Sequence, residues 1–144
     1  MRVKILVGFL CVFILSIACF SNAIEIKNEG ASGNCLIVYY FYGDIRCASC
    51  HKIEDYTKET IDKYFGEEIG SGAIVYAAVN IDEAENEHFV EEYQLYTKSV
   101  VLSLIKNGEE ARNKNLVKIW EYLGNRTQFE EYEQQEIHEF LEEL

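Results

Sequence analysis

The chain of 144 residues contains no proline, and its only methionine is Met1. Without proline, none of its loops can be shaped by a cis X–Pro bond. Basic residues are also few, because 13 Lys and Arg stand against 25 Asp and Glu, and the formal net charge is -12 at pH 7. Nucleic acids and anionic membrane surfaces bind basic stripes, and this chain has none. Nucleic acid is therefore excluded as a partner.

The remaining composition is that of a folded protein. Hydrophobic residues make up 49% of the chain and charged residues 26%, which is too apolar for a disordered segment. A chain of this length has room for one ordinary domain with its own core and a processing segment. We find no internal repeat or low-complexity tract, so a single domain is expected.

The first 23 residues have the pattern of a secretory signal peptide. Arg2 and Lys4 precede an uncharged apolar run over residues 5–20, and small residues at 21–23 form a cleavage site. Two alternatives are lipoprotein processing at Cys19, which would leave the protein lipid-anchored, and an uncleaved membrane anchor. We therefore expect an exported protein, in the periplasm or outside the cell, with membrane contact only through this segment.

The order of predicted elements begins after a polar linker over residues 24–34. A continuous apolar and aromatic run over 35–42 is typical of a buried strand, and helical periodicity follows over 51–65. Gly70-Ser71-Gly72 predicts a turn before a second buried strand over 73–81. Strand, helix and strand in this order predict a parallel unit with a right-handed crossover.

The second half predicts a helix, a hairpin and a final helix. Asp82 with Glu85 resembles a capping box that opens a helix with Phe89, Tyr93 and Tyr96 on its inner face. A strand over 99–106 then meets Asn107-Gly108, a strong hairpin signal, and the return arm is expected within 109–120.

A second capping box, Thr127 with Glu130, predicts the start of the terminal helix. Its apolar residues should face the core and its many acids should form a solvated face. These acids are Glu130, Glu131, Glu133, Glu136, Glu139, Glu142 and Glu143.

The candidate site is the C-x-x-C motif formed by Cys47 and Cys50, which falls between the first strand and its helix. At a helix N-terminus, unpaired N–H groups and the helix dipole favour thiolate over thiol. We therefore expect Cys47 to be the nucleophile and Cys50 the resolving thiol of a thiol–disulfide exchange. Arg46 and His51 are expected to lower the pKa of Cys47, while Cys35 should be a buried thiol.

Other interpretations of this motif remain open. Cys47, Cys50 and His51 together offer two thiolates and an imidazole, a donor set suited to copper or zinc. The pair could also be an inert structural disulfide, or the domain a non-catalytic binding subunit of a larger redox assembly. We expect no other cofactor, and a partner that is a protein thiol or disulfide, such as a reductase or redox protein.

The succession of strand, C-x-x-C corner, helix, strand, helix, hairpin and helix predicts an α/β protein with a thioredoxin-like fold, a central mixed sheet of about four strands flanked by helices. The motif over residues 39–54 and the segments 113–121 and 129–144 resemble thioredoxin-like proteins of the nitrophenyl compound nitroreductase subunit ArsF family. The resemblance covers residues 36–144 and implies a small exported redox domain.

Two departures from ordinary thioredoxins concern the site. Thioredoxins place a cis-proline before the third strand, facing the cysteines, where this chain has Ser99 between Lys98 and Val100. A cis bond at a non-proline residue would cost about 3 kcal/mol, so we expect a trans peptide and an altered groove. The buried acid of the preceding strand has no counterpart here, so proton transfer is expected to use water, Asp44 or His51.

Overall fold

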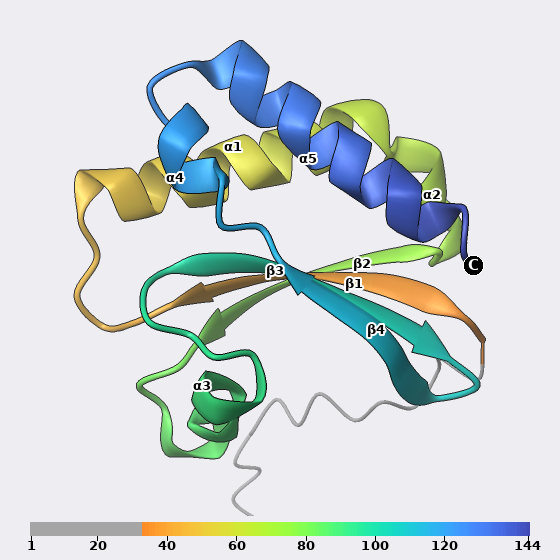
Figure 1. The fold of residues 1–144 in the computed structure, drawn as a ribbon, viewed down its shortest axis with the longest axis horizontal. Helices are drawn as coiled ribbons and strands as arrows, with labels where there is room; N and C mark the ends of the chain where they lie inside the picture. Colours follow the sequence, from red (N-terminus) through yellow and green to blue (C-terminus); the bar gives the residue numbers. More distant parts are fainter. Residues whose placement is uncertain (1–32) are drawn as a thin grey trace, which may run out of the picture.

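The structure is a computed structural model, and it describes residues 33–144. The predicted signal peptide, the alternative processing site at Cys19 and residues 24–32 of the predicted linker lie outside the described residues. Ten elements follow one another (Figure 1), and the cysteine pair lies at the start of the second, with Cys47 as its N-cap and Cys50 on its first turn. They are β1 (Cys35–Tyr42), α1 (Ala48–Tyr64), α2 (Gly66–Ser71), β2 (Ile74–Asn80), the 3-10 turn η1 (Ala84–Asn86), α3 (His88–Glu92), β3 (Ser99–Lys106), β4 (Glu109–Asn115), α4 (Ile119–Tyr122) and α5 (Arg126–Leu141).

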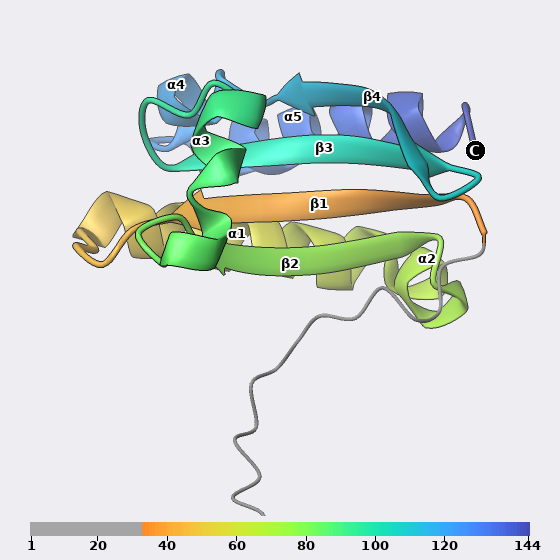
Figure 2. The ribbon, with the colours of Figure 1, turned by 90° about the horizontal axis from the view of Figure 1, so that it is seen from below.

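The four strands form one mixed sheet in the order β2-β1-β3-β4. β1 is parallel to β2 and antiparallel to β3, which is antiparallel to β4. Helices α1, α2, α4 and α5 cover one face of this sheet, and α3 lies on the other (Figures 1 and 2). The predicted α/β class and mixed four-stranded sheet are confirmed, with β3 at the predicted residues.

The alternation of β1 divides the core into two clusters, one on each face of the sheet. Leu36, Val38 and Tyr40 face α1 and α5 and are fully buried, whereas Phe41 packs on the α3 side. A strand buried on both faces explains the uninterrupted apolar run in the sequence. Burial of each such large side chain contributes on the order of 1.5–3 kcal/mol.

The hairpin between β3 and β4 forms where the sequence predicted it. Asn107 has φ of 55° and Gly108 has φ of 82°, which is the left-handed backbone that a tight two-residue hairpin turn requires. Helix α1 also forms as predicted, although it begins at Ala48, inside the motif. The short helix α2 was predicted only as a turn, because a helix with no buried residue carries no apolar periodicity.

Both predicted capping boxes are wrong. Neither η1 nor α3 has a side-chain cap, and Asp82 instead accepts a hydrogen bond from the backbone N–H of Asp44. Because α3 is short and ends at Glu92, Tyr96 is 94% exposed rather than packed inward. Helix α5 is capped by Asn125, not Thr127. In the first case the expected capping residue is bound to a distant backbone N–H, and in the second another residue caps the helix; spacing alone reveals neither.

The prediction that all acids of α5 are solvated is also wrong. Glu130, Glu133 and Glu136 are buried, and Glu133 is fully so. The hydroxyl of Thr57 on α1 donates to a carboxyl oxygen of Glu133 at 2.6 Å. On the side of α5 that packs against α1 and the sheet, Glu130 and Glu136 form ion pairs within the fold, whereas the second carboxyl oxygen of Glu133 has no partner.

Among residues 33–144, no helix has the length and apolar character needed to cross a membrane.

Candidate functional site

The loop that leads into the cysteine pair is held by hydrogen bonds of Asp44 and Asp82. Asp44 donates its backbone N–H to Asp82 at 2.7 Å, and its carboxylate accepts from the side chain of Asn80 at 2.8 Å. Gly43 is needed at this approach, because a Cβ there would lie 2.5 Å from a carboxylate oxygen of Asp82. The loop that precedes Cys47 is therefore anchored to the end of β2.

This anchor gives a first prediction. Asp82→Ala is expected to lower the free energy of unfolding by about 1 kcal/mol, the typical contribution of one hydrogen bond, and to speed amide exchange at Asp44. Urea unfolding and hydrogen exchange measure the two effects. Glu85→Ala removes an equal charge from the same region and is the control. A loss of stability as large in the control would contradict the assigned role of Asp82.

Cys47 and Cys50 are both free thiols, and their sulfur atoms lie 2.8 Å apart. Cys47 is the N-cap of α1 and is exposed, whereas Cys50 lies on the first turn and is 1% exposed. Only a small movement separates this arrangement from a bonded S–S pair of about 2.05 Å. The Cys47 thiol is thus accessible to solvent, and the buried Cys50 thiol lies next to it.

The electrostatics of Cys47 favour its thiolate. Its pKa is lowered first by the hydrogen bond from the Cys50 thiol, and then by backbone N–H groups of the first turn of α1, those of Cys50 and Ser49 among them. The predicted effect of the helix N-terminus therefore acts through specific donors. Cys35, by contrast, is buried at the opposite end of β1, and burial raises the pKa of its thiol.

Two functional neighbours of the pair were not predicted from the sequence. Tyr40 on β1 donates its hydroxyl to the backbone carbonyl of Cys50 at 2.7 Å. Glu54 on α1 forms an ion pair with Arg46. The spacing of Glu54, four residues after Cys50 on a predicted helix, could have indicated the second neighbour. Tyr40 lies in the apolar run over 35–42, and its position in the sequence is typical of a core residue.

The predicted tuning residues lie around the motif in different settings. Arg46 is close to both cysteines in sequence but is engaged by Glu54 and lies over the ring of Tyr42, 4.5 Å from its centroid. His51 is exposed on α1. Ser99 opens β3 opposite Phe41, is buried, and donates its hydroxyl to the carbonyl of Thr97. Their effects on Cys47 stay predictions.

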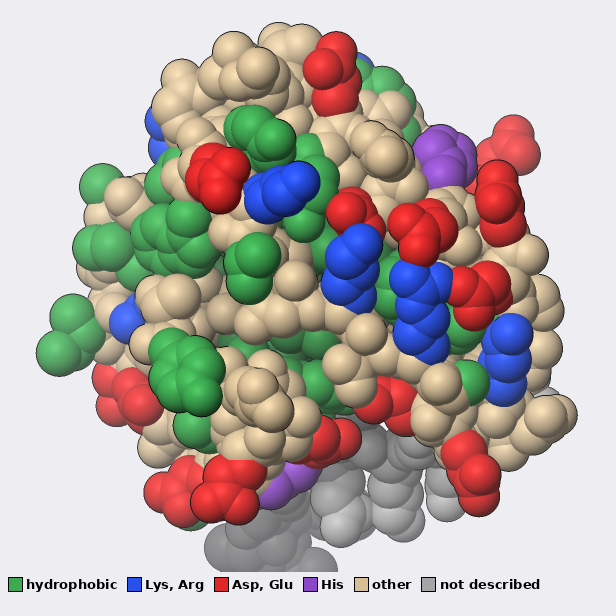
Figure 3. Space-filling view, viewed as in Figure 1, with side chains coloured by type: hydrophobic (Ala, Val, Ile, Leu, Met, Phe, Trp, Pro, Cys, Tyr) green, Lys and Arg blue, Asp and Glu red, His purple; other side chains and the backbone are tan. Residues whose placement is uncertain are grey.

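An apolar groove lies at the same end of the sheet as the cysteine pair, beside the start of β3. It has a volume of about 350 Å³ and is lined by Ser99, Tyr96, Val117 and Trp120, among others. Trp120, predicted as core or groove wall, is a groove wall anchored by a hydrogen bond to the Lys98 carbonyl. Figure 3 shows hydrophobic side chains gathered over this edge of the molecule.

The peptide bond before Ser99, at the edge of the groove, is the one predicted to be trans. No cis peptide bond occurs within residues 33–144, so the bond before Ser99 is trans, as expected from the absence of proline.

The alternative metal site is not supported by the geometry. Within the described part of the chain, no three His, Cys, Asp or Glu side chains are grouped closely enough to hold a metal ion. Cys47, Cys50 and His51 therefore do not form a preassembled set of ligands. A tetrahedral site would need a third protein ligand converging on the two sulfurs.

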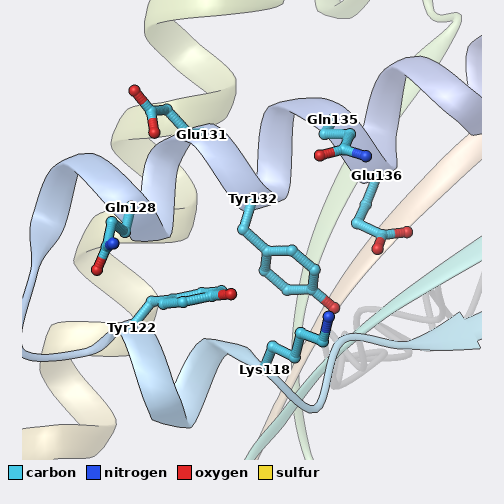
Figure 4. A pocket seen from close by; sticks show the side chains of 7 residues that line it. All are labelled: Lys118, Tyr122, Gln128, Glu131, Tyr132, Gln135 and Glu136. Atoms are coloured by element: carbon cyan, nitrogen blue, oxygen red, sulfur yellow. The ribbon is translucent and has the colours of Figure 1, made fainter.

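A second cleft lies between α4 and α5 and has a volume of about 280 Å³ (Figure 4). Its wall includes Tyr122 and Tyr132, whose ring centroids are 5.6 Å apart, and Lys118. None of the predicted site residues lines it. The two tyrosine rings pack against each other between α4 and α5, and we assign the cleft no catalytic role.

The position of the pair within the topology decides the fold family. A parallel β1–α1–β2 unit carries the C-x-x-C motif at the start of α1, and an antiparallel hairpin and a helix on the same face as α1 follow. The fold is thioredoxin-like. The thioredoxin-like domain thus places its cysteine pair beyond the C-terminal end of β1, at the end of the sheet where β3 begins.

No family model matches the chain, and no curated protein matches it. Among solved structures it is similar to a thioredoxin from Entamoeba histolytica, at 19% identity over 72% of this chain and 84% of that chain, with a TM-score of 0.41. It is also similar to thioredoxin from Fasciola hepatica, at 20% identity over 66% and 84%, with a TM-score of 0.38. The thioredoxin-like fold itself is established by the strand order and strand directions.

Proposed function

We propose that this protein carries out thiol–disulfide exchange through Cys47 and Cys50. The observation that supports this most strongly is the pairing of an exposed thiol at a helix N-terminus with a buried thiol whose sulfur lies 2.8 Å away. A purely structural disulfide has no need of an exposed sulfur with a lowered pKa. The apolar groove at the same end of the sheet suits contact with a protein partner.

The exchange proceeds in two displacements. The thiolate of Cys47 attacks one sulfur of a partner disulfide, a mixed S–S bond forms, and the other partner sulfur leaves as a thiolate. Cys50 then loses its proton to water and attacks the Cys47 sulfur, so that the partner is released as a dithiol and this protein becomes the disulfide. Two electrons pass to the partner, and the reverse steps oxidise it.

The setting of this activity is part of the same proposal. The signal-like segment over residues 1–23 supports action after export, in the periplasm or outside the cell, where disulfides persist. A reductase or another redox protein would then exchange electrons with the pair. The motif's resemblance to the nitrophenyl compound nitroreductase subunit ArsF family supports a role as a subunit of such a redox system.

Trapping experiments test the proposal. The purified wild type should form a disulfide between Cys47 and Cys50 that dithiothreitol reverses, as measured by alkylation and mass spectrometry. Cys50→Ser should accumulate a mixed disulfide at Cys47 with a small disulfide such as oxidised glutathione, because the resolving thiol is missing. Cys35→Ser, which changes a buried thiol at the far end of β1, is the control. Failure to form either species would contradict thiol–disulfide exchange.

A further inference from the structure

The charge next to the nucleophilic cysteine is neutralised within the fold. Arg46 immediately precedes Cys47, yet its guanidinium is paired with the Glu54 carboxylate on the next turn of α1. The two side chains are only 23% and 25% exposed. The guanidinium also lies over the ring of Tyr42, 4.5 Å from its centroid. Arg46, in the loop, is therefore held by two contacts, one with α1 and one with β1.

The same ion pair is connected to the resolving cysteine. Arg46 lies 5.8 Å from the ring centroid of Tyr40, whose hydroxyl donates to the carbonyl of Cys50. Burial raises the pKa of Tyr40 to about 12, against a lowering by Arg46, so this hydroxyl stays neutral and keeps its proton for the carbonyl. Glu54 itself follows Cys50 by one helical turn, which places it on the same side of α1.

The effect of this cluster on the cysteines depends on charge. When Cys47 is deprotonated the reduced pair carries a negative charge, whereas the disulfide carries none. A positive charge nearby stabilises the thiolate and makes the pair more oxidising, and a negative charge has the opposite effect. At a partly buried site these effects are weakly screened. In the Arg46–Glu54 ion pair the two opposite charges offset one another.

We propose that Glu54 is a positioning residue that sets the reduction potential of the Cys47–Cys50 pair by holding and neutralising Arg46. This inference rests on the proposed exchange function, because a reduction potential has meaning only for a reversible pair. Glu54 touches neither sulfur and acts through Arg46. The other titratable or charged groups around the motif are Asp44 in the loop, Asp82 after β2, His51 and Lys52 on α1, and the hydroxyls of Tyr40, Tyr42 and Tyr76 from β1 and β2.

The test is a set of redox titrations against reduced and oxidised glutathione, made on Glu54→Gln, Arg46→Gln and the double variant. Glu54→Gln leaves Arg46 unopposed and should shift the equilibrium toward the dithiol by on the order of fivefold. Arg46→Gln should shift it by a similar factor toward the disulfide, and the double variant should return to within about twofold of the wild type. The pKa of Cys47, measured from the pH dependence of its alkylation, should fall in Glu54→Gln and rise in Arg46→Gln.

Glu59→Gln is the matched control, because it breaks another ion pair of α1, with Arg126, away from the motif. It should leave the glutathione equilibrium unchanged. The inference is overturned if Glu54→Gln leaves the equilibrium unchanged, shifts it toward the disulfide, or shifts it no more than Glu59→Gln. Arg46→Gln tests the same cancellation with the opposite sign and does not depend on the stability of Glu54→Gln. A wild type with no reversible disulfide would instead overturn the proposed function.

Discussion

Cys47→Ser is expected to abolish the reduction of small disulfides, with a fall in rate of at least about a thousandfold, because a serine hydroxyl is not ionised at neutral pH and cannot form the mixed disulfide. The rate is measured with the reduced protein and oxidised glutathione in excess. In the structure, only Cys47 of the three described cysteines is exposed, so no other described thiol can replace it.

Cys35→Ser supplies the comparison for this result. Its thiol is 4% exposed and lies at the other end of β1, so the exchange rate should stay within about threefold of the wild type even if stability falls somewhat. A Cys47→Ser variant that kept an appreciable fraction of the wild-type rate would show that another thiol is the nucleophile. Equal losses in the two variants would indicate that unfolding, rather than chemistry, explains them.

Glu133→Gln is expected to stabilise the protein by about 3 kcal/mol more at pH 8 than at pH 5. Glu133 is fully buried between α5 and α1, and burial raises its pKa to about 8 despite the hydrogen bond from Thr57. The glutamine has the same shape and keeps an oxygen that accepts from Thr57. It removes the ability to ionise and places an amide nitrogen where the wild type has the unpartnered Oε2.

The direction of this pH dependence follows from the proton balance. In the unfolded chain the carboxyl ionises near its ordinary pKa of about 4.3, whereas in the folded chain it keeps its proton to about pH 8. Between these values the folded state binds more protons, so this group lowers stability as the pH rises. The penalty is absent below the unfolded pKa and complete above the folded one. Glutamine has no such penalty at any pH.

Urea unfolding of both proteins at pH 5 and pH 8 measures the difference. Glu131→Gln is the control, because Glu131 is exposed on the same helix and should give no pH-dependent difference. A stability difference between Glu133→Gln and the wild type that is equal at the two pH values would contradict the expected titration. A glutamine variant that is less stable at pH 8 would mean that the carboxylate is ionised and paired in the folded state.

The element order could be predicted because each strand and each long helix has a pattern that depends on its own residues. The apolar run of β1, the Asn107-Gly108 turn and the periodicity of α1 all act within a few residues, and all three predictions are confirmed. The C-x-x-C corner follows from the same local information, because the motif lies between a strand and a helix. The capping boxes failed because several polar groups compete for each helix start, and their competition depends on distant contacts such as the one between Asp44 and Asp82.

Sequence alone was thus sufficient for the thioredoxin-like fold and for the placement of Cys47 and Cys50, since both depend on short-range patterns and on the usual handedness of a parallel crossover. Only the folded chain shows that Glu54 neutralises Arg46, that Tyr40 contacts the backbone of Cys50, and that Glu133 is buried. These properties are decided by packing, because the environment of a charge depends on which elements surround it and not on its neighbours in the chain.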